Sequence, residues 1–184
     1  LKEFQNFQLT KLKEFFKAIK TNSRYYNKSL ASYEHMESYS EFQSLPCLEQ
    51  EYLRETPLDE MRAASWADMV TISSSSGTTG KSKIVLWTES ALKEENKWNT
   101  LGYLLLGVRA ESRLAMLMPL ELSRCPSYLE ACRTIGAFAV PFGRIRNDIE
   151  MENAIIKMKE LGVTHIHCST SRLLSITQKA KELG

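Results

Sequence analysis

From Arg113 onward the sequence alternates short apolar runs with amphipathic segments of helical spacing. The runs Arg113–Met118 and Phe138–Pro141 are mostly apolar, Val163–His167 is rich in β-branched residues, and all three predict strands. Two earlier strands are predicted at Met69–Ser73 and Lys83–Trp87. Strands in alternation with helices favour a parallel sheet covered by helices, so this pattern limits the fold class most strongly.

The helices between these strands have recognisable ends. One is expected after Thr88 and runs towards Leu106. The next has Pro126 in its first turn and Gly136 just past its end, as helices prefer. A third stops at Gly162, and it presents one apolar face made of Met151, Ala154, Ile155, Met158 and Leu161. The last helix is expected from about residue 172 to residue 183.

The part of the chain before residue 66 has a different character. A helical stripe needs a packing partner there, and it consists of Leu9, Leu12, Phe15, Phe16 and Ile19. A short helix is expected around Leu48–Arg54. We therefore predict an α/β protein with a helical N-terminal segment over residues 1–66. An α/β part with a mostly parallel sheet flanked by helices follows over residues 67–184.

A loop rich in glycine and hydroxyl side chains lies between the first two predicted strands. It reads Ser73-Ser74-Ser75-Ser76-Gly77-Thr78-Thr79-Gly80-Lys81-Ser82-Lys83. Glycine lets the backbone come close to a ligand, successive N–H groups can surround an anion, and an ammonium group adds a point charge. A polyphosphate is the ligand that this composition favours. A structural turn or flexible linker is the alternative, since Ser/Gly runs also form solvated coils.

A nucleotide triphosphatase loop is a further alternative. Gly80-Lys81-Ser82 matches the end of the G-x-x-x-x-G-K-[ST] pattern. Ser75 stands where that pattern needs its first glycine, and a predicted strand follows where the pattern needs a helix. The surroundings therefore disfavour this type of loop.

Residues Ser75–Lys83 closely resemble the phosphate loop of the AMP-forming acyl-adenylating enzymes, the acid–CoA ligase superfamily. Ser82 replaces the proline that is common in that loop. The Ser75-Ser76 start is similar to the phenylacetate–CoA ligase branch. Two further segments resemble that branch, Asn22–Leu30 and Tyr39–Leu48. Ile135–Pro141 and Val163–Ser171 are similar to segments of the family. The resemblance implies a partial N-terminal domain of an adenylate-forming enzyme.

The resemblance also implies a reaction and a binding site. Such a ligase activates a carboxylic acid with Mg-ATP as an acyl-adenylate and passes the acyl group to a thiol, with coenzyme A as the expected acceptor. Lys81 would neutralise phosphate charge as the catalytic residue, with help from Lys83. The other phosphate-binding residues would be Ser75, Ser76, Gly77, Thr78, Thr79 and Gly80. Enzymes of this family are longer and carry their magnesium ligands past the matched region, so these ligands are expected beyond residue 184 and the chain alone is expected to be inactive.

Composition agrees with a globular cytoplasmic protein. Apolar residues make up 43% and charged residues 25% of the chain, and the net charge is +2. A balanced charge predicts no nucleic-acid partner, and no apolar run reaches the roughly 18 residues that span a bilayer, so no membrane partner is expected. We leave a homodimer open. Free thiols are expected rather than disulfides at Cys47, Cys125, Cys132 and Cys168.

One other pair of residues has a chemical reading. His165 and His167 alternate on a predicted strand, which places both imidazoles on one face. They could be two metal ligands, but no third ligand has a suitable spacing, so we predict no metal site and expect a packed or cleft-facing pair. A non-catalytic binding module on the same scaffold is the alternative to an enzyme.

Overall fold

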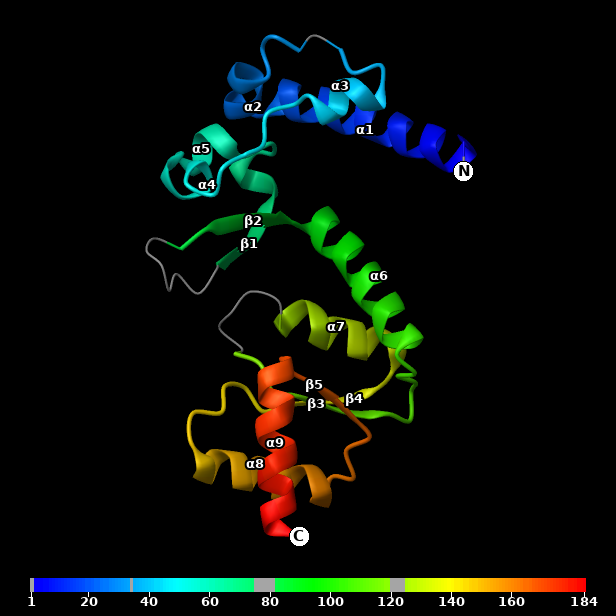
Figure 1. Cartoon of the computed structure of the whole chain (residues 1–184), viewed down its shortest axis with the longest axis vertical. Coiled ribbons are helices and arrows are strands. Elements are labelled where there is room, and N and C mark those ends of the chain that lie inside the picture. The colour runs from blue at the N-terminus through cyan, green and yellow to red at the C-terminus, as the bar shows by residue number, and fades with distance from the viewer. Residues whose placement is uncertain (1, 34, 75–81, 120–124) are drawn as a thin grey trace. The chain divides into compact units, whose positions relative to one another are not determined.

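The computed structural model describes residues 2–33, 35–74, 82–119 and 125–184 (Figure 1). The described residues form two compact units. The first contains those of Leu1–Ile72 and Gly77–Thr88, and the second contains those of Ser73–Ser76 and Glu89–Gly184. Within the described ranges, no helix has both the length and the apolar character needed to cross a bilayer.

The first unit consists mainly of helices. They are α1 (Lys2–Asn22), α2 (Arg24–Ser29), α3 (Tyr39–Gln43), α4 (Tyr52–Glu55), α5 (Leu58–Met61) and the 3₁₀ turn η1 (Trp66–Asp68). Strand β1 (Met69–Ser74) follows and pairs with β2 (Ile84–Thr88) in a two-stranded sheet; the last two residues of β1 are grouped with the second unit. A small core of Phe16, Leu30 and Met36 holds the helices together. The short helix expected around Leu48–Arg54 is present only in part, as α4, because the residues before Tyr52 are not helical.

Helix α1 buries only part of the apolar stripe predicted for it. Phe16 is buried, and Leu12 and Ile19 pack against the same core. Phe15 was expected on the stripe but is 62% exposed, which corrects that prediction. Positions 12, 16 and 19 follow the spacing of four and three residues that keeps side chains on one helix face, whereas position 15 is displaced to the edge of that face.

Ser23 links two helices of the first unit. It caps the N-terminus of α2, because its hydroxyl oxygen accepts a hydrogen bond from the backbone N–H of Tyr26 at 3.4 Å. The same hydroxyl lies 3.1 Å and 3.0 Å from the carbonyl oxygens of Glu60 and Met61 at the end of α5. Ser23 is only 1% exposed, so a buried polar group here is satisfied by both neighbouring helices.

The second unit alternates helices and strands in the predicted order. Its elements are α6 (Glu89–Leu105), β3 (Arg113–Met116), α7 (Cys125–Ile135), β4 (Phe138–Pro141), α8 (Asp148–Glu160), β5 (His165–His167) and α9 (Thr170–Leu183). The three strands form a sheet of order β4-β3-β5 with both pairings parallel. The predicted fold class is confirmed.

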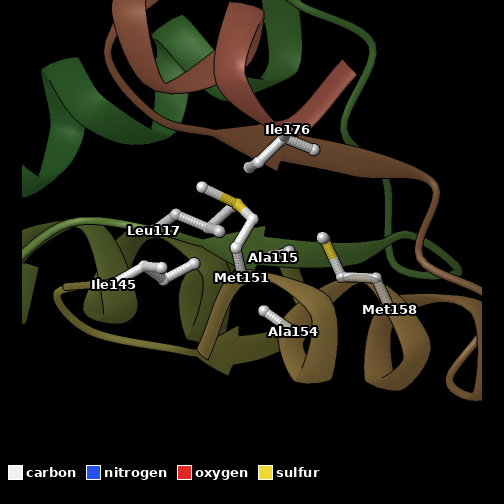
Figure 2. Packing of buried hydrophobic residues seen from close by; sticks show 7 residues of the cluster. All are labelled: Ala115, Leu117, Ile145, Met151, Ala154, Met158 and Ile176. Atoms are coloured by element: carbon white, nitrogen blue, oxygen red, sulfur yellow. The ribbon is translucent and has the colours of Figure 1, made fainter. Parts of the chain in front are cut away.

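Residues of β3 alternate between the two sides of this sheet. Leu114 and Met116 belong to a buried cluster with Tyr103 of α6 and Ala131 and Cys132 of α7. The intervening residue Ala115 belongs to a second cluster. In Figure 2, Ala115 and Leu117 lie among Met151, Ala154 and Met158 of α8, together with Ile145 and Ile176. Helices α6 and α7 therefore cover one face of the sheet, and α8 and α9 cover the other.

Two glycines end helices of the second unit where they were expected. Gly136 follows α7 with a φ of 83°, and Gly162 follows the end of α8 with a φ of 59°. Both values lie in the left-handed region that side chains with a Cβ rarely adopt, which is why glycine stands there.

Candidate functional site

The segment between β1 and β2 carries the predicted phosphate site. Its candidates Ser75, Ser76, Gly77, Thr78, Thr79, Gly80 and Lys81 lie outside the described residues. Lys83 is described, and its Nζ lies 3.4 Å from Oε1 of Gln50. The assignment of these residues to phosphate therefore stays a prediction.

The surroundings of this segment are described on both sides. β1 ends at Ser74, and β2 begins at Ile84. The segment thus connects two strands, as the sequence predicts. A nucleotide triphosphatase loop runs directly into a helix whose N-terminus faces the phosphates. Because a strand follows Lys83 here, the triphosphatase alternative lacks the architecture it requires.

A pocket of about 520 Å³ lies wholly within the second unit. Helix α6 and strand β5 supply most of its described walls, and α7 contributes Tyr128. The other described lining residues are Leu106, Val108, Leu114 and Cys168. The lining residues are Trp98, Asn99, Gly102, Tyr103, Leu106, Val108, Leu114, Tyr128, His165, Ile166, His167 and Cys168. Its volume falls within the range of about 300–1,000 Å³ found for small-molecule sites.

Three aromatic rings meet at the wall of this pocket. The imidazole of His167 lies edge-on to the Tyr128 ring, with centroids 4.5 Å apart, and edge-on to the Tyr103 ring at 5.7 Å. The Tyr103 hydroxyl is 2.6 Å from Nδ1 of His167. Tyr103 is almost fully buried, so this hydrogen bond fixes the orientation of the imidazole.

Burial also sets the charge state of His167. Loss of contact with water lowers its pKa from the ordinary value of 6.5. The imidazole is therefore neutral at pH 7. A phenol hydroxyl is a good donor and a neutral imidazole nitrogen a good acceptor, so we assign the Tyr103 O–H as donor to Nδ1 and place the imidazole proton on Nε2.

His165 and His167 share one face of β5, as the sequence predicts, and both line the pocket. They align with Leu114 and Met116 of β3, whose side chains belong to the α6–α7 side of the sheet. His165 Nδ1 lies 2.8 Å from the Thr164 hydroxyl. Among the described residues, no group of three or more His, Cys, Asp or Glu side chains is arranged to hold a metal ion. Because both side chains line the pocket, the pair is cleft-facing.

The aromatic partners of His167 were not identified as site residues from the sequence. Tyr103 and Tyr128 lie on separate amphipathic helices, where aromatic residues are ordinary core material. Only the pairing of β5 with β3 brings them to His167. The available signal was the alternation of two histidines on a strand that follows a helix.

The thiols agree with the expectation of unpaired cysteines where the side chain is described. Cys47 is exposed and Cys168 is half-buried, and both are free thiols. Cys132 is buried in the cluster against α7. Cys168 packs against the cluster on the α8–α9 side of the sheet, and burial raises the pKa of its thiol. It is therefore no activated nucleophile.

The sequence matches no family model and no curated protein. The structure, however, resembles solved structures of 2-hydroxyisobutyryl-CoA ligase. An open conformation in complex with 2-HIB-AMP and CoA matches 97% of this chain with a TM-score of 0.85 and 12% identity. The thioesterification state, also with 2-HIB-AMP and CoA, matches 98% with a TM-score of 0.86 and 14% identity.

This chain spans about two fifths of the length of these structures, 43% of the first and 40% of the second. At this level of identity, the comparison establishes the fold alone. The chain has the fold of the N-terminal part of an adenylate-forming ligase.

Proposed function

We propose that the chain is the ATP-binding part of an AMP-forming acid–thiol ligase. The observation that supports it most is a glycine- and hydroxyl-rich segment between two strands, in a fold shared with ligases solved in complex with acyl-AMP and CoA. The substrates in this proposal are ATP with magnesium, a carboxylic acid and coenzyme A. The Ser75-Ser76 start of the loop supports a place in the phenylacetate–CoA ligase branch.

The chemistry explains why such a loop is needed. When a carboxylate attacks the α-phosphorus of ATP, negative charge develops on the leaving pyrophosphate. Donors that are already oriented towards this charge stabilise the transition state without reorganisation. In the proposal, backbone N–H and hydroxyl groups of residues 75–80 bind the β- and γ-phosphate oxygens. Lys81 supplies the positive charge, and Lys83 assists.

Calorimetric titration of the chain with Mg-ATP tests the proposal. We expect Lys81→Ala to weaken ATP binding about tenfold or more, because a charge-assisted contact to phosphate is lost. Thr78→Ala should have a smaller effect in the same direction. Lys97→Ala is the matched control, since Lys97 is an exposed lysine paired with Glu94 on α6 and should leave the affinity unchanged. Equal affinities for all four proteins would contradict the assigned role of the loop.

A second measurement separates a ligase from a binding module. Pyrophosphate exchange into ATP that depends on an added carboxylic acid reports adenylation. In a protein that joins this chain to the remaining segments of such a ligase, exchange that disappears in Lys81→Ala would support the ligase directly. We expect the chain by itself to bind ATP without exchange, because the family resemblance implies magnesium and adenine contacts in segments that this chain does not match. Hydrolysis of ATP without any carboxylic acid would contradict the proposal.

A further inference from the structure

The pocket of the second unit has an unusual chemical lining. Among the described residues that line it, none is Lys, Arg, Asp or Glu. Trp98, Tyr103 and Tyr128 contribute aromatic surface, and Leu106, Val108 and Leu114 contribute aliphatic surface. An ionised group placed there would lose its hydration without meeting an opposite charge, which is costly. The lining therefore suits an uncharged, largely apolar group.

His167 adds a directional contact to this largely apolar pocket, whose other polar lining side chains include Asn99 and His165. Its Nδ1 is occupied by the Tyr103 hydroxyl, which leaves the Nε2–H as the remaining donor of the ring. Among the described residues, no hydrogen-bond acceptor is recorded for this N–H. A half-buried donor gains most from a ligand that brings an acceptor oxygen.

We propose that this pocket binds an uncharged aromatic or branched apolar group that carries one acceptor oxygen, with the His167 Nε2–H as its hydrogen-bond donor. Tyr103 is a positioning residue, because its hydroxyl holds the imidazole in the tautomer that donates. The inference rests on the proposed function in one respect: there, the group is the side chain of the carboxylic acid that is activated. An aryl or branched acid with a hydroxyl, ether or keto oxygen is the substrate class that follows.

The same geometry disfavours two other ligands. Aromatic walls can bind a quaternary ammonium ion by cation–π contacts. Here, however, an N–H group belongs to the lining, and its positive end would repel a cation. A carboxylate would accept a hydrogen bond from His167, yet the described part of the lining has no lysine or arginine to compensate its charge.

Four probes of similar ring size test the chemical class. Toluene, anisole, benzoate and phenyltrimethylammonium are titrated into the chain, and binding is followed by NMR shifts of Trp98, Tyr128 and His167. We expect anisole to bind about 2- to 10-fold more tightly than toluene, the effect of one added hydrogen bond. Benzoate and phenyltrimethylammonium should bind more weakly than both. Tightest binding by either ion, equal binding of anisole and toluene, or no shift with any probe would overturn the inference.

Variants assign the preference to the named groups. His167→Phe keeps an aromatic ring but removes the donor, so the preference for anisole over toluene should disappear while toluene still binds. Tyr103→Phe keeps the ring and releases Nδ1, so the preference should fall in part. His35→Gln, in the first unit, is the control and should behave like the unaltered chain. A preference for anisole that survives in His167→Phe would overturn the role of His167.

These measurements test the proposal for the phosphate loop and the proposal for the pocket independently. His167→Phe should titrate with Mg-ATP like the unaltered chain, and Lys81→Ala should bind anisole normally. If Lys81→Ala bound Mg-ATP as tightly as the unaltered chain while the anisole preference was observed, the proposed function would be contradicted and the assignment of the pocket would remain. If the anisole preference were absent while Lys81→Ala weakened Mg-ATP binding, the assignment of the pocket would be contradicted and the proposed function would remain.

Discussion

Each of the two units of the chain is stabilised in its interior by a different kind of contact. Among the described residues of the first unit, the buried cluster of Phe16, Leu30 and Met36 is small, and hydrogen bonds of Ser23 to the end of α5 add a polar contact between helices. In the second unit, a sheet carries a buried cluster on each face, and Ala115, Met116, Ala131 and Cys132 have no exposed surface. Because burial of apolar surface is the main stabilising term, the second unit is expected to be the more robust one.

The contrast suggests where each unit tolerates change. Removing one apolar side chain from a two-sided core opens a cavity that neighbouring elements cannot fill easily. In the first unit, part of the stability comes instead from the hydrogen bonds by which Ser23 links α2 and α5, which we call the polar joint. The predictions below test this difference in order of decreasing effect.

The largest effect is expected at Met116. Its side chain is fully buried between the sheet and α7, so Met116→Ala should lower the free energy of unfolding by about 2–5 kcal/mol. Urea denaturation followed by circular dichroism measures the change. Ile149→Ala is the control, because Ile149 is 74% exposed on α8 and its truncation should cost less than about 0.5 kcal/mol. Equal costs at the two positions would show that the two-sided core is not what stabilises this unit.

A smaller effect is expected at the polar joint of the first unit. Ser23→Ala removes the cap of α2 and leaves the carbonyl oxygens of Glu60 and Met61 without their donor. The expected cost is about 1–2 kcal/mol, seen as faster hydrogen exchange of the α2 amides. Ser29→Ala, at the exposed end of the same helix, serves as the matched substitution. If both serines behave alike, the joint does not hold the helices.

The smallest effect is a dependence of stability on pH. Burial lowers the pKa of His167, so below pH 6.5 the unfolded chain binds more protons than the folded chain. The contribution of His167 to the free energy of unfolding should therefore be fully present above pH 6.5 and should decline as the pH falls below this value. The neighbouring titratable groups on the elements around the imidazole are Tyr103, Tyr128, His165 and Cys168.

A second set of groups acts in a lower pH window. A hydrogen bond from Lys13 lowers the pKa of Glu37, and one from Arg62 lowers that of Asp59. These carboxylates lose stabilising contacts only as the pH falls below about 4.5, so measurements between pH 7 and 5.5 isolate the histidine. His167→Phe should flatten the decline in that range, and His165→Gln should keep it. If the decline in stability between pH 7 and 5.5 persisted in His167→Phe, a group other than His167 would be its cause.

Much of the second unit was predictable because its local signals agree with its fold. Apolar runs gave the strands, and Gly136 and Gly162 marked helix ends that the structure confirms. The strands are shorter than expected: β3 ends at Met116 rather than Met118, and β5 begins at His165 rather than Val163. A strand ends where its hydrogen bonds with the neighbouring strand end, and this pairing cannot be read from the sequence of the strand itself.

The first unit was less predictable, and so was the pocket. Helices α2, α3 and α5 are only four to six residues long, too short for a periodic pattern. The caps of α2 and α3 were the usable signal, and Ser38 with Glu41 forms a complete capping box at α3. The pocket depends on Tyr103, Tyr128 and His167 meeting through space. No spacing along the chain encodes that meeting.

Strand β3 has a consequence for how this protein can change. Its even-numbered side chains face the pocket side, and its odd-numbered ones face α8 and α9. Exchanges at position 114 can thus reshape the ligand cavity while the opposite interior keeps its contacts. New specificities are accessible on such a scaffold by single steps, without rebuilding the layer behind it.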